Sequence, residues 1–240
     1  LMVDGVLYFS AGLRRDVIAI NAGTGETLWI HRFDEGARGL AAPRRNSGRG
    51  VSYWTDGQGD ERIFVITPGF HLIALDAATG LPMPNFGNDG IVDMKRGFDQ
   101  PVALDEQNLG SSSPGMVFED LIIVGPAMAG SGRPASQVGV PSHITAWDTR
   151  TGERRWIFHT VPKPGEFGYD TWENDSAQIG GNAGAWAPLA LDEELGYVYL
   201  PLEVATSDYY GGHRLGDNLF SSSLVCLDAR TGERVWHFQT

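Results

Sequence analysis

The chain repeats one short pattern four times, and this repeat restricts its fold more than any other feature. In each copy an apolar stretch ends in Asp or Asn, and Thr-Gly follows after two intervening residues; the copies lie at 18–29, 73–80, 145–156 and 225–236. The Asp or Asn side chain can accept hydrogen bonds from backbone N–H groups just beyond it, and glycine tolerates a positive φ. Each copy therefore predicts a tight turn between two β-strands.

A tryptophan lies four residues after the turn glycine in three copies, at Trp29, Trp156 and Trp236, whereas the second copy has Pro84 there. The ring opens the next strand and is large enough to pack on a neighbouring unit. Another apolar strand precedes each turn; these strands cover 4–9, 61–66, 119–124 and 196–200. The unit is thus strand, loop, strand, turn and strand, which is most of a four-stranded sheet.

Nothing long between the units has the periodicity of an amphipathic helix. The intervals between the turn glycines (Gly25, Gly80, Gly152 and Gly232) leave room for a four-stranded unit and, in places, a long inserted loop. Repeated units of this size with hairpin character are typical of propeller blades. The sequence therefore predicts an all-β fold, a partial β-propeller that forms one incomplete domain over residues 1–240.

Charge and cysteine content exclude several classes of protein. The chain has 30 acidic and 18 basic residues and a net charge of −12, which argues against binding to nucleic acid or to an anionic membrane surface. Its single cysteine, Cys226, excludes an internal disulfide and predicts packing in the core, because it lies in a repeat strand. No apolar run is long enough for a transmembrane helix. Since the chain opens directly on strand material at Leu1, without a signal peptide, we expect a piece of a longer protein.

The inserted loops hold the unusual residues. They cover about 34–61, 126–142, 161–187 and 203–220, and they are rich in Gly, Arg, Asp, Trp and Tyr. Loops of this composition on a regular scaffold are where a small-molecule site is expected. The six histidines show no metal-ligand spacing, so each is expected to be a surface or strand residue; they are His31, His71, His143, His159, His213 and His237.

The repeat resembles the tryptophan-docking motif of the pyrroloquinoline quinone (PQQ) dehydrogenases, which are eight-bladed propellers, and the resemblance covers essentially the whole chain. Loop motifs at 49–53, 186–188, 199–201 and 236–240 are similar to the membrane-bound glucose dehydrogenase branch. The resemblance implies about half of such a propeller. The alternative is a non-catalytic propeller scaffold of the outer-membrane assembly type, which shares the repeat; the long loops favour the enzyme.

Two residues carry the strongest implied roles in cofactor binding. Arg49 matches the arginine that contacts a PQQ carboxylate, and a guanidinium suits this role because it can bind a carboxylate through two parallel hydrogen bonds. Trp186 matches the tryptophan that forms a flat floor under the quinone. A surface arginine and a core tryptophan are the alternatives.

Weaker matches lie in two further loops. Ser111, Ser112 and Ser113 precede Pro114, as in a motif whose hydroxyl reaches PQQ; the residues do not say which serine does so, and we retain Ser112 and Ser113 as candidates. Thr206 and Asp208 match a Thr-x-Asp in the loop over the site. An ordinary turn and a loop cap are the alternatives here.

The sequence also departs from the family pattern. Calcium, which prefers hard oxygen ligands, is an open candidate only, because Gln137 is loosely placed and Val204 stands where an amide is expected. Pro43-Arg44 replaces the Cys-Cys pair of the alcohol dehydrogenases. The family's catalytic aspartate would follow Thr240, so the catalytic residues are unknown within this chain. The resemblance implies a periplasmic enzyme that passes hydride from a sugar or alcohol to PQQ. It also implies a quinone or cytochrome as electron acceptor, and any membrane attachment outside this segment.

Overall fold

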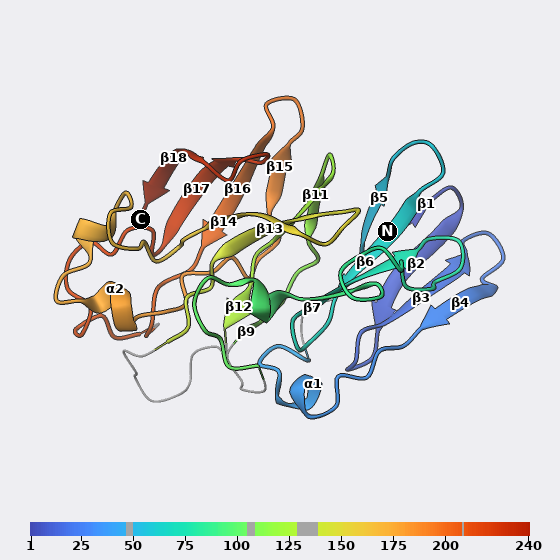
Figure 1. Ribbon diagram of the computed structural model, residues 1–240, viewed down its shortest axis with the longest axis horizontal. Helices are drawn as coiled ribbons and strands as arrows, with labels where there is room; N and C mark the ends of the chain where they lie inside the picture. The colour runs from blue at the N-terminus through green and yellow to red at the C-terminus, as the bar shows by residue number, and fades with distance from the viewer. Residues whose placement is uncertain (47–49, 105–108, 129–138, 208) are drawn as a thin grey trace.

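Four antiparallel sheets of four strands each follow one another along the chain (Figure 1). The structure, a computed structural model, describes residues 1–46, 50–104, 109–128, 139–207 and 209–240. Each sheet is one blade, and its strands are hydrogen-bonded in chain order. The prediction of an all-β partial propeller is confirmed. The first strand of each sheet was not part of the predicted unit and completes the blade.

The strand and helix bounds are as follows. Blade 1 holds β1 (Met2–Val3), β2 (Val6–Ala11), β3 (Asp16–Asn21) and β4 (Thr27–His31); blade 2 holds β5 (Ser52–Thr55), β6 (Glu61–Ile66), β7 (His71–Asp76) and β8 (Ile91–Asp93). Blade 3 holds β10 (Met116–Phe118), β11 (Leu121–Val124), β13 (Ile144–Asp148) and β14 (Arg154–Phe158); blade 4 holds β15 (Ala190–Asp192), β16 (Tyr197–Leu202), β17 (Ser223–Asp228) and β18 (Arg234–Gln239). A short pair, β9 (Leu109–Gly110) and β12 (Ala127–Met128), and four short helices, α1 (Ala37–Ala41), η1 (Met94–Gly97), η2 (Tyr169–Thr171) and α2 (Ser176–Ile179), lie in the connections.

The repeated turn directly follows the third strand of every blade, and in blades 1, 3 and 4 it leads straight into the fourth strand. In blade 1, Oδ1 of Asn21 accepts hydrogen bonds from the backbone N–H groups of Gly23 and Thr24, at 2.9 and 3.0 Å. The N–H of Gly25 closes the turn on the carbonyl of Asn21 at 2.8 Å, and Gly25 has a φ of 76°. Asp76, Asp148 and Asp228 make the same kind of turn. The four turns therefore occupy equivalent places, as the repeat predicts.

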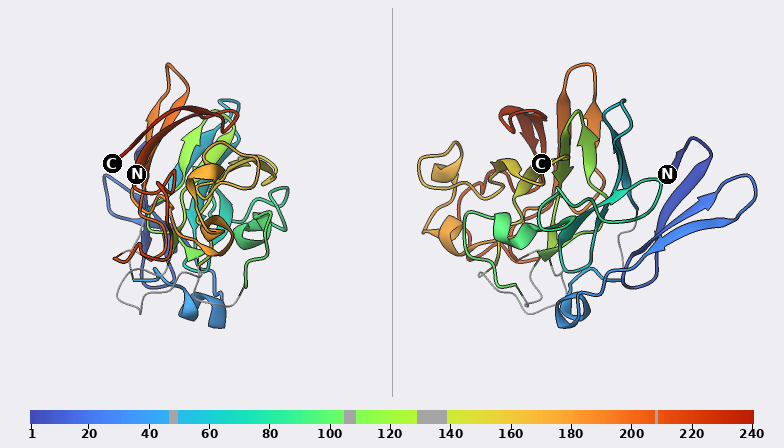
Figure 2. Two further views of the ribbon diagram at one scale, coloured as in Figure 1. Left: turned by 90° about the vertical axis from the view of Figure 1, so that its left-hand side faces the viewer. Right: turned by 45° about the vertical axis from the view of Figure 1, so that its right-hand side comes forward.

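The core lies between the blades. Three clusters of buried apolar side chains fill the spaces between blades 1 and 2, 2 and 3, and 3 and 4. The first strands of neighbouring blades adjoin, since β10 contacts β5 on one side and β15 on the other. Figure 2 shows the blades side by side in chain order. Strands of blades 2 and 3 are covered on both faces, which explains why β6, β7, β11 and β13 read as nearly continuous apolar runs.

Two of the repeat tryptophans, Trp29 and Trp156, dock on the turn of the following blade. The indole N–H of Trp29 donates to the carbonyl of Ala77 at 3.0 Å, and the ring lies so close to Gly80 that a Cβ there would be 2.5 Å from it. Trp156 of blade 3 repeats this geometry on blade 4. Its indole N–H donates to the carbonyl of Ala229 at 3.1 Å, and its ring lies over Gly232. The predicted docking on a neighbouring unit is confirmed at both positions. The turn glycine is thus needed twice, for its φ and for the space that the ring occupies.

Blade 2, which has Pro84 in place of the tryptophan, docks on blade 3 by other means. The N–H of Gly87 donates to the carbonyl of Thr151 in the next turn at 2.8 Å. The buried guanidinium of Arg62 donates to the carbonyls of Thr149 and Arg150, both at 2.9 Å, and pairs with Asp60 through two bonds. Backbone and guanidinium contacts therefore replace the indole at this interface.

The outward faces of blades 1 and 4 carry exposed apolar side chains. On β18, Trp236 and Phe238 are 40% and 65% exposed, and on β4, Leu28 and Ile30 are 48% and 43% exposed. Cys226 is fully buried, as predicted. In the part of the chain that the structure describes, no helix is long and apolar enough to span a membrane.

The connection between blades 1 and 2 is fastened to blade 2 by a buried carboxylate. Glu35 accepts hydrogen bonds from the Thr67 hydroxyl at 2.6 Å and the Gly69 N–H at 2.7 Å, and it lies 2.5 Å from Nδ1 of His71. Burial raises the pKa of Glu35, but the bonds from His71, Thr67 and Gly69 outweigh it and hold the pKa below its ordinary value. The charged form of this carboxyl is therefore the one that the fold stabilises.

This carboxylate predicts a loss of stability in acid. Because the pKa of Glu35 is lower in the folded state, its contribution is present above the ordinary value of 4.5 and is lost as the pH falls through the folded pKa. We expect the thermal midpoint of wild-type protein to fall more steeply below this pH than that of Glu35→Gln, which has no proton to take up. Parallel pH profiles for the two proteins would contradict the assignment.

Candidate functional site

Several loops meet at one end of the blades, beside the line of first strands. The N–H of Asn182 donates to the carbonyl of Val140, and the N–H of Ser142 donates back to Asn182, both at 3.0 Å. The N–H of Glu203 donates to Gly184 at 2.9 Å, and Gly125 is so close to the carbonyl of Ala185 that no larger residue fits. The loops that were expected to hold a site therefore do lie together.

Trp186 stands at the end of this packed segment. Residues 180–185 are buried, whereas Trp186 is 48% exposed. Its backbone is held in place, because the hydroxyl of Ser113 donates to the carbonyl of Trp186 at 2.9 Å. Trp186 is therefore not a core tryptophan, which was the alternative. A fixed backbone with a half-exposed ring makes a flat surface on which a planar ligand can stack.

The serine segment is held from blade 1 by a buried arginine. Arg15 is 5% exposed, and its guanidinium donates to the carbonyl of Ile66 at 2.9 Å, of Arg44 at 3.0 Å and of Ser111 at 2.6 Å. The Ser111 hydroxyl in turn donates to the carbonyl of Ser113 at 2.7 Å. A continuous series of hydrogen bonds thus runs from blade 1 to Trp186, and the hydroxyls of Ser111 and Ser113 serve within it. Of the two retained serines, the structure brings Ser113 to Trp186 through its hydroxyl.

Arg49 lies outside the described residues, but the residue after it reaches the same place. The N–H of Gly50 donates to the Ser10 hydroxyl at 2.9 Å, and a Cβ on Gly50 would lie 3.2 Å from Pro114. Gly50 thus packs directly against the residue that follows Ser113. Gly50, the serine segment and Trp186 converge even though they come from three different connections.

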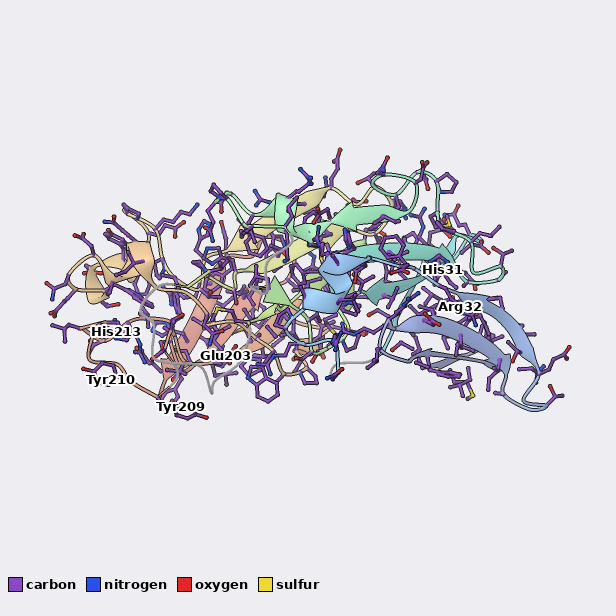
Figure 3. All side chains as sticks on the ribbon, turned by 90° about the horizontal axis from the view of Figure 1, so that it is seen from below. His31, Arg32, Glu203, Tyr209, Tyr210 and His213 are labelled. Atoms are coloured by element: carbon purple, nitrogen blue, oxygen red, sulfur yellow. The ribbon has the colours of Figure 1, made fainter. Side chains whose placement is uncertain are left out.

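Thr206 also belongs to this group of loops. It is buried, its N–H donates to Gly181 at 3.0 Å, and its hydroxyl has no hydrogen-bond partner among the described residues. Asp208, its predicted companion, lies outside them. Figure 3 shows the loop to which Thr206 belongs, with Glu203 near its start and Tyr209, Tyr210 and His213 further out. Tyr209 is 86% exposed, so this loop carries an aromatic ring into solvent beside the site.

The structure does not test calcium binding at the two positions that the sequence analysis compared with the family's metal ligands. Gln137 lies outside the described residues, and the carbonyl of Val204 accepts from the side-chain amide of Asn182 at 2.8 Å. No group of three or more His, Cys, Asp or Glu side chains that could hold a metal ion occurs among the described residues.

A second polar cluster adjoins the site, and the sequence did not reveal it. His159 lies 2.7 Å from Glu166 and 3.0 Å from Asp99, and Lys163 pairs with Asp99 at 2.8 Å. Burial alone would raise the pKa of Asp99, but Lys163 and His159 lower it to about 2. His143 packs edge-on against His159, with ring centroids 4.7 Å apart. Asp99 and His143 are distant from the other three in the sequence, so only the closeness of His159, Lys163 and Glu166 in one loop could have indicated part of the cluster.

Comparisons with known proteins agree with the fold and the repeat. The family model for the β-propeller domain of glucose, ethanol and alcohol dehydrogenases that use PQQ matches residues 1–240. The glycerol dehydrogenase large subunit of Gluconobacter oxydans is 32% identical over 99% of this chain and 31% of its own length. Quinoprotein glucose dehydrogenase A of Acinetobacter calcoaceticus is 28% identical over 97% of this chain and 29% of its own length.

The fold is also similar to that of a solved structure. The quinohemoprotein alcohol dehydrogenase ADHIIG of Pseudomonas putida superposes with a TM-score of 0.78 at 28% identity, covering all of this chain and 33% of its own. The chain spans about a third of the length of these relatives. By its matched domain and its repeat, the chain belongs to the β-propeller family of PQQ-dependent glucose, ethanol and alcohol dehydrogenases.

Proposed function

We propose that this chain supplies part of the cofactor floor of a PQQ-dependent dehydrogenase that oxidises a sugar or an alcohol. The observation that carries the proposal is the half-exposed ring of Trp186, whose backbone is bound by Ser113 where the loops converge. The named relatives act on glycerol, glucose and alcohols, which supports the substrate class. A non-catalytic scaffold needs neither a presented ring nor a loop cluster around it.

The residues present fit a planar, polar cofactor. Trp186 offers a stacking surface, and the buried hydroxyl of Thr206, which is unpaired among the described residues, can bond one of its oxygens. Arg49 would bind one of the PQQ carboxylates through charge-assisted hydrogen bonds. When bound, PQQ supplies the hydride-accepting quinone, and the chain's part is to orient it and to exclude water from its lower face. Ser112, Ser113 and Asp208 complete the proposed set, with Ser113 acting through Trp186.

Further features of the proposal come from the relatives. Several of these are quinohemoproteins, which supports a cytochrome or quinone as the electron acceptor, and we propose a periplasmic location on the same family ground. Calcium remains a candidate without a ligand set in the described residues, so no role in the chemistry is assigned to it.

The test is PQQ binding by the full-length protein. We expect Trp186→Ala and Arg49→Ala each to raise the PQQ dissociation constant about tenfold or more, which corresponds to roughly 1.4 kcal/mol per decade. Trp186→Phe, which keeps a flat ring, should lose less, and Arg45→Ala on the same loop should bind as wild type. Titration followed by quinone absorbance measures all four. Unchanged affinity in both alanine variants, with folding intact, would leave the scaffold as the better explanation.

A further inference from the structure

Two buried residues with an unfavourable backbone conformation precede Trp186. Asn182 and Ala183 have φ values of 59° and 56°. Among the described residues, the other consecutive non-glycine pair with positive φ, Asn174 and Asp175, is exposed. Asparagine tolerates this region, whereas alanine is disfavoured because its Cβ crowds the backbone, and glycine adopts it freely. Such strain persists only where the surrounding structure maintains it, and it is concentrated at functional sites.

Asn182 joins the loops on its two sides. On one side its N–H donates to the carbonyl of Val140, and its carbonyl accepts from the N–H of Ser142, both at 3.0 Å. On the other side its side-chain amide donates to the carbonyl of Val204 at 2.8 Å. The Asn182 side chain therefore connects the segment before Trp186 to the loop that carries Thr206.

The methyl group of Ala183 lies in a small apolar cluster that is separate from the cores between the blades. The buried members of this cluster are Val161, Trp172, Ala183 and Ala205, and Ala177 packs against them. The Cβ that makes the φ of Ala183 unfavourable is thus the same atom that anchors the segment in the cluster. Glycine would remove the strain, but it would also remove the anchor.

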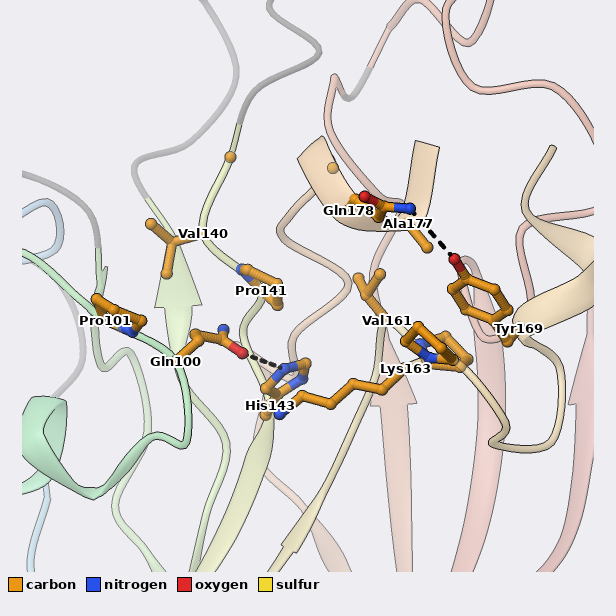
Figure 4. A pocket seen from close by; sticks show the side chains of 14 residues that line it. Gln100, Pro101, Val140, Pro141, His143, Val161, Lys163, Tyr169, Ala177 and Gln178 are labelled. Carbon is orange, nitrogen blue, oxygen red and sulfur yellow. Dashed lines mark hydrogen bonds between the residues drawn. The ribbon is translucent and has the colours of Figure 1, made fainter. Parts of the chain in front are cut away.

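The segment borders a cavity of about 380 Å³, so packing does not confine it on every side (Figure 4). Val161 and Ala177 of the cluster line this cavity and lie side by side in Figure 4. Gly180, two residues before Asn182, lines it as well. Because protein interiors are otherwise closely packed, a backbone segment beside open space has room to shift. Specific anchors, rather than packing alone, therefore determine its conformation.

We propose that Asn182 and Ala183 are positioning residues, which set the direction of the chain toward Trp186 and so hold its ring in one orientation. They act at the start of the segment, and the hydroxyl of Ser113 acts at its end through the carbonyl of Trp186. A ring that is already ordered loses less conformational entropy when a planar ligand stacks on it, so the ligand binds more tightly. The inference rests on the proposed stacking role of Trp186, but the order of the ring can be measured without a cofactor.

Glycine substitutions test the two side chains. Asn182→Gly and Ala183→Gly keep the positive φ accessible, so any effect comes from the missing side chain and not from a strained backbone. Ala205→Gly is the matched control, because it removes a methyl group from the same cluster at a residue without positive φ.

The first measurement is fluorine NMR of PQQ-free, full-length protein labelled with fluorotryptophan. The signal that disappears in Trp186→Phe belongs to Trp186. We expect this signal to move toward its position in the unfolded chain in Asn182→Gly and in Ala183→Gly, because the ring samples more orientations. Signals of tryptophans outside the cluster should keep their positions, which a general loss of stability would not allow. Ala205→Gly should leave the Trp186 signal unchanged.

The second measurement is PQQ affinity, which should fall about threefold or more in Ala183→Gly and stay at the wild-type value in Ala205→Gly. The proposal is overturned if the Trp186 signal stays at its wild-type position in both glycine variants, or if Ala205→Gly moves it equally. If the signal moves but Trp186→Ala still binds PQQ as wild type does, the positioning stands and the proposed stacking role fails.

Discussion

Replacing Trp156 with alanine should lower the free energy of unfolding by about 3–5 kcal/mol, the cost typical of removing a large buried aromatic side chain. The ring is 7% exposed, belongs to the cluster between blades 3 and 4, and donates to Ala229 at 3.1 Å. Its removal leaves a cavity above Gly232 and an unpaired carbonyl. Chemical denaturation of the purified protein, followed by intrinsic fluorescence, measures the loss.

Two variants define the origin of that loss. Trp156→Phe keeps most of the apolar area but loses the N–H, so about 1 kcal/mol of the loss should be separable as the hydrogen bond. Gly232→Ala should also destabilise the fold by disrupting this contact from the blade 4 side. The new Cβ would lie 2.7 Å from the ring, and the φ of 74° disfavours alanine. If Trp156→Ala unfolded at the wild-type denaturant concentration, docking would not stabilise the fold.

Replacing Arg15 with methionine should be costly for stability and should also weaken PQQ binding. The substitution leaves the carbonyls of Ile66, Arg44 and Ser111 without this donor, and a lost bond to a charged group costs about 1.5–3 kcal/mol. We expect a total loss of at least about 3 kcal/mol. Because the same guanidinium holds the serine segment under Trp186, PQQ affinity should fall in the fraction that stays folded.

The control is Arg32→Met, in the same blade, whose side chain is 70% exposed and pairs with Asp16 at 3.2 Å. Surface pairs of this kind contribute about 0–1 kcal/mol, so this variant should keep both stability and PQQ binding. Arg15→Lys, which retains the charge but not the forked geometry, should lie between the two. Normal PQQ affinity in folded Arg15→Met would show that the hydrogen-bond series does not position Trp186.

The repeat predicted the blades well because its determinants are local. Asn21 and Gly25 shape their turn through residues within the turn itself, and the same holds in the other three copies. The interface without a tryptophan was not predictable in this way. Arg62 reaches the turn of blade 3 across 87 residues of sequence, and no local pattern marks a charged strand residue as a buried docking group.

In the candidate site, too, local motifs were predictable from the sequence and long-range contacts were not. The loop motifs indicated Trp186, Ser113 and Thr206, and the structure brings these into one group of loops. What orders them could not be read from the sequence, since Arg15 and Ser111 are 96 residues apart and meet through a backbone carbonyl, which any residue type offers. Ser112 and Ser113 stay candidates for the hydroxyl that reaches the cofactor, and nothing in the sequence indicated that the Ser113 hydroxyl also donates to the carbonyl of Trp186.

Tryptophan docking has a direction in time as well as in space. In both indole contacts the donor precedes its acceptor in the chain, by 48 residues for Trp29 and by 73 for Trp156. A ribosome adds about 5–20 residues per second, so each ring emerges several seconds before the carbonyl that will receive it. During that interval the newest blade presents an uncovered indole. During translation the indoles of blades 1 and 3 therefore stay exposed until the turns of blades 2 and 4 are synthesised and cover them.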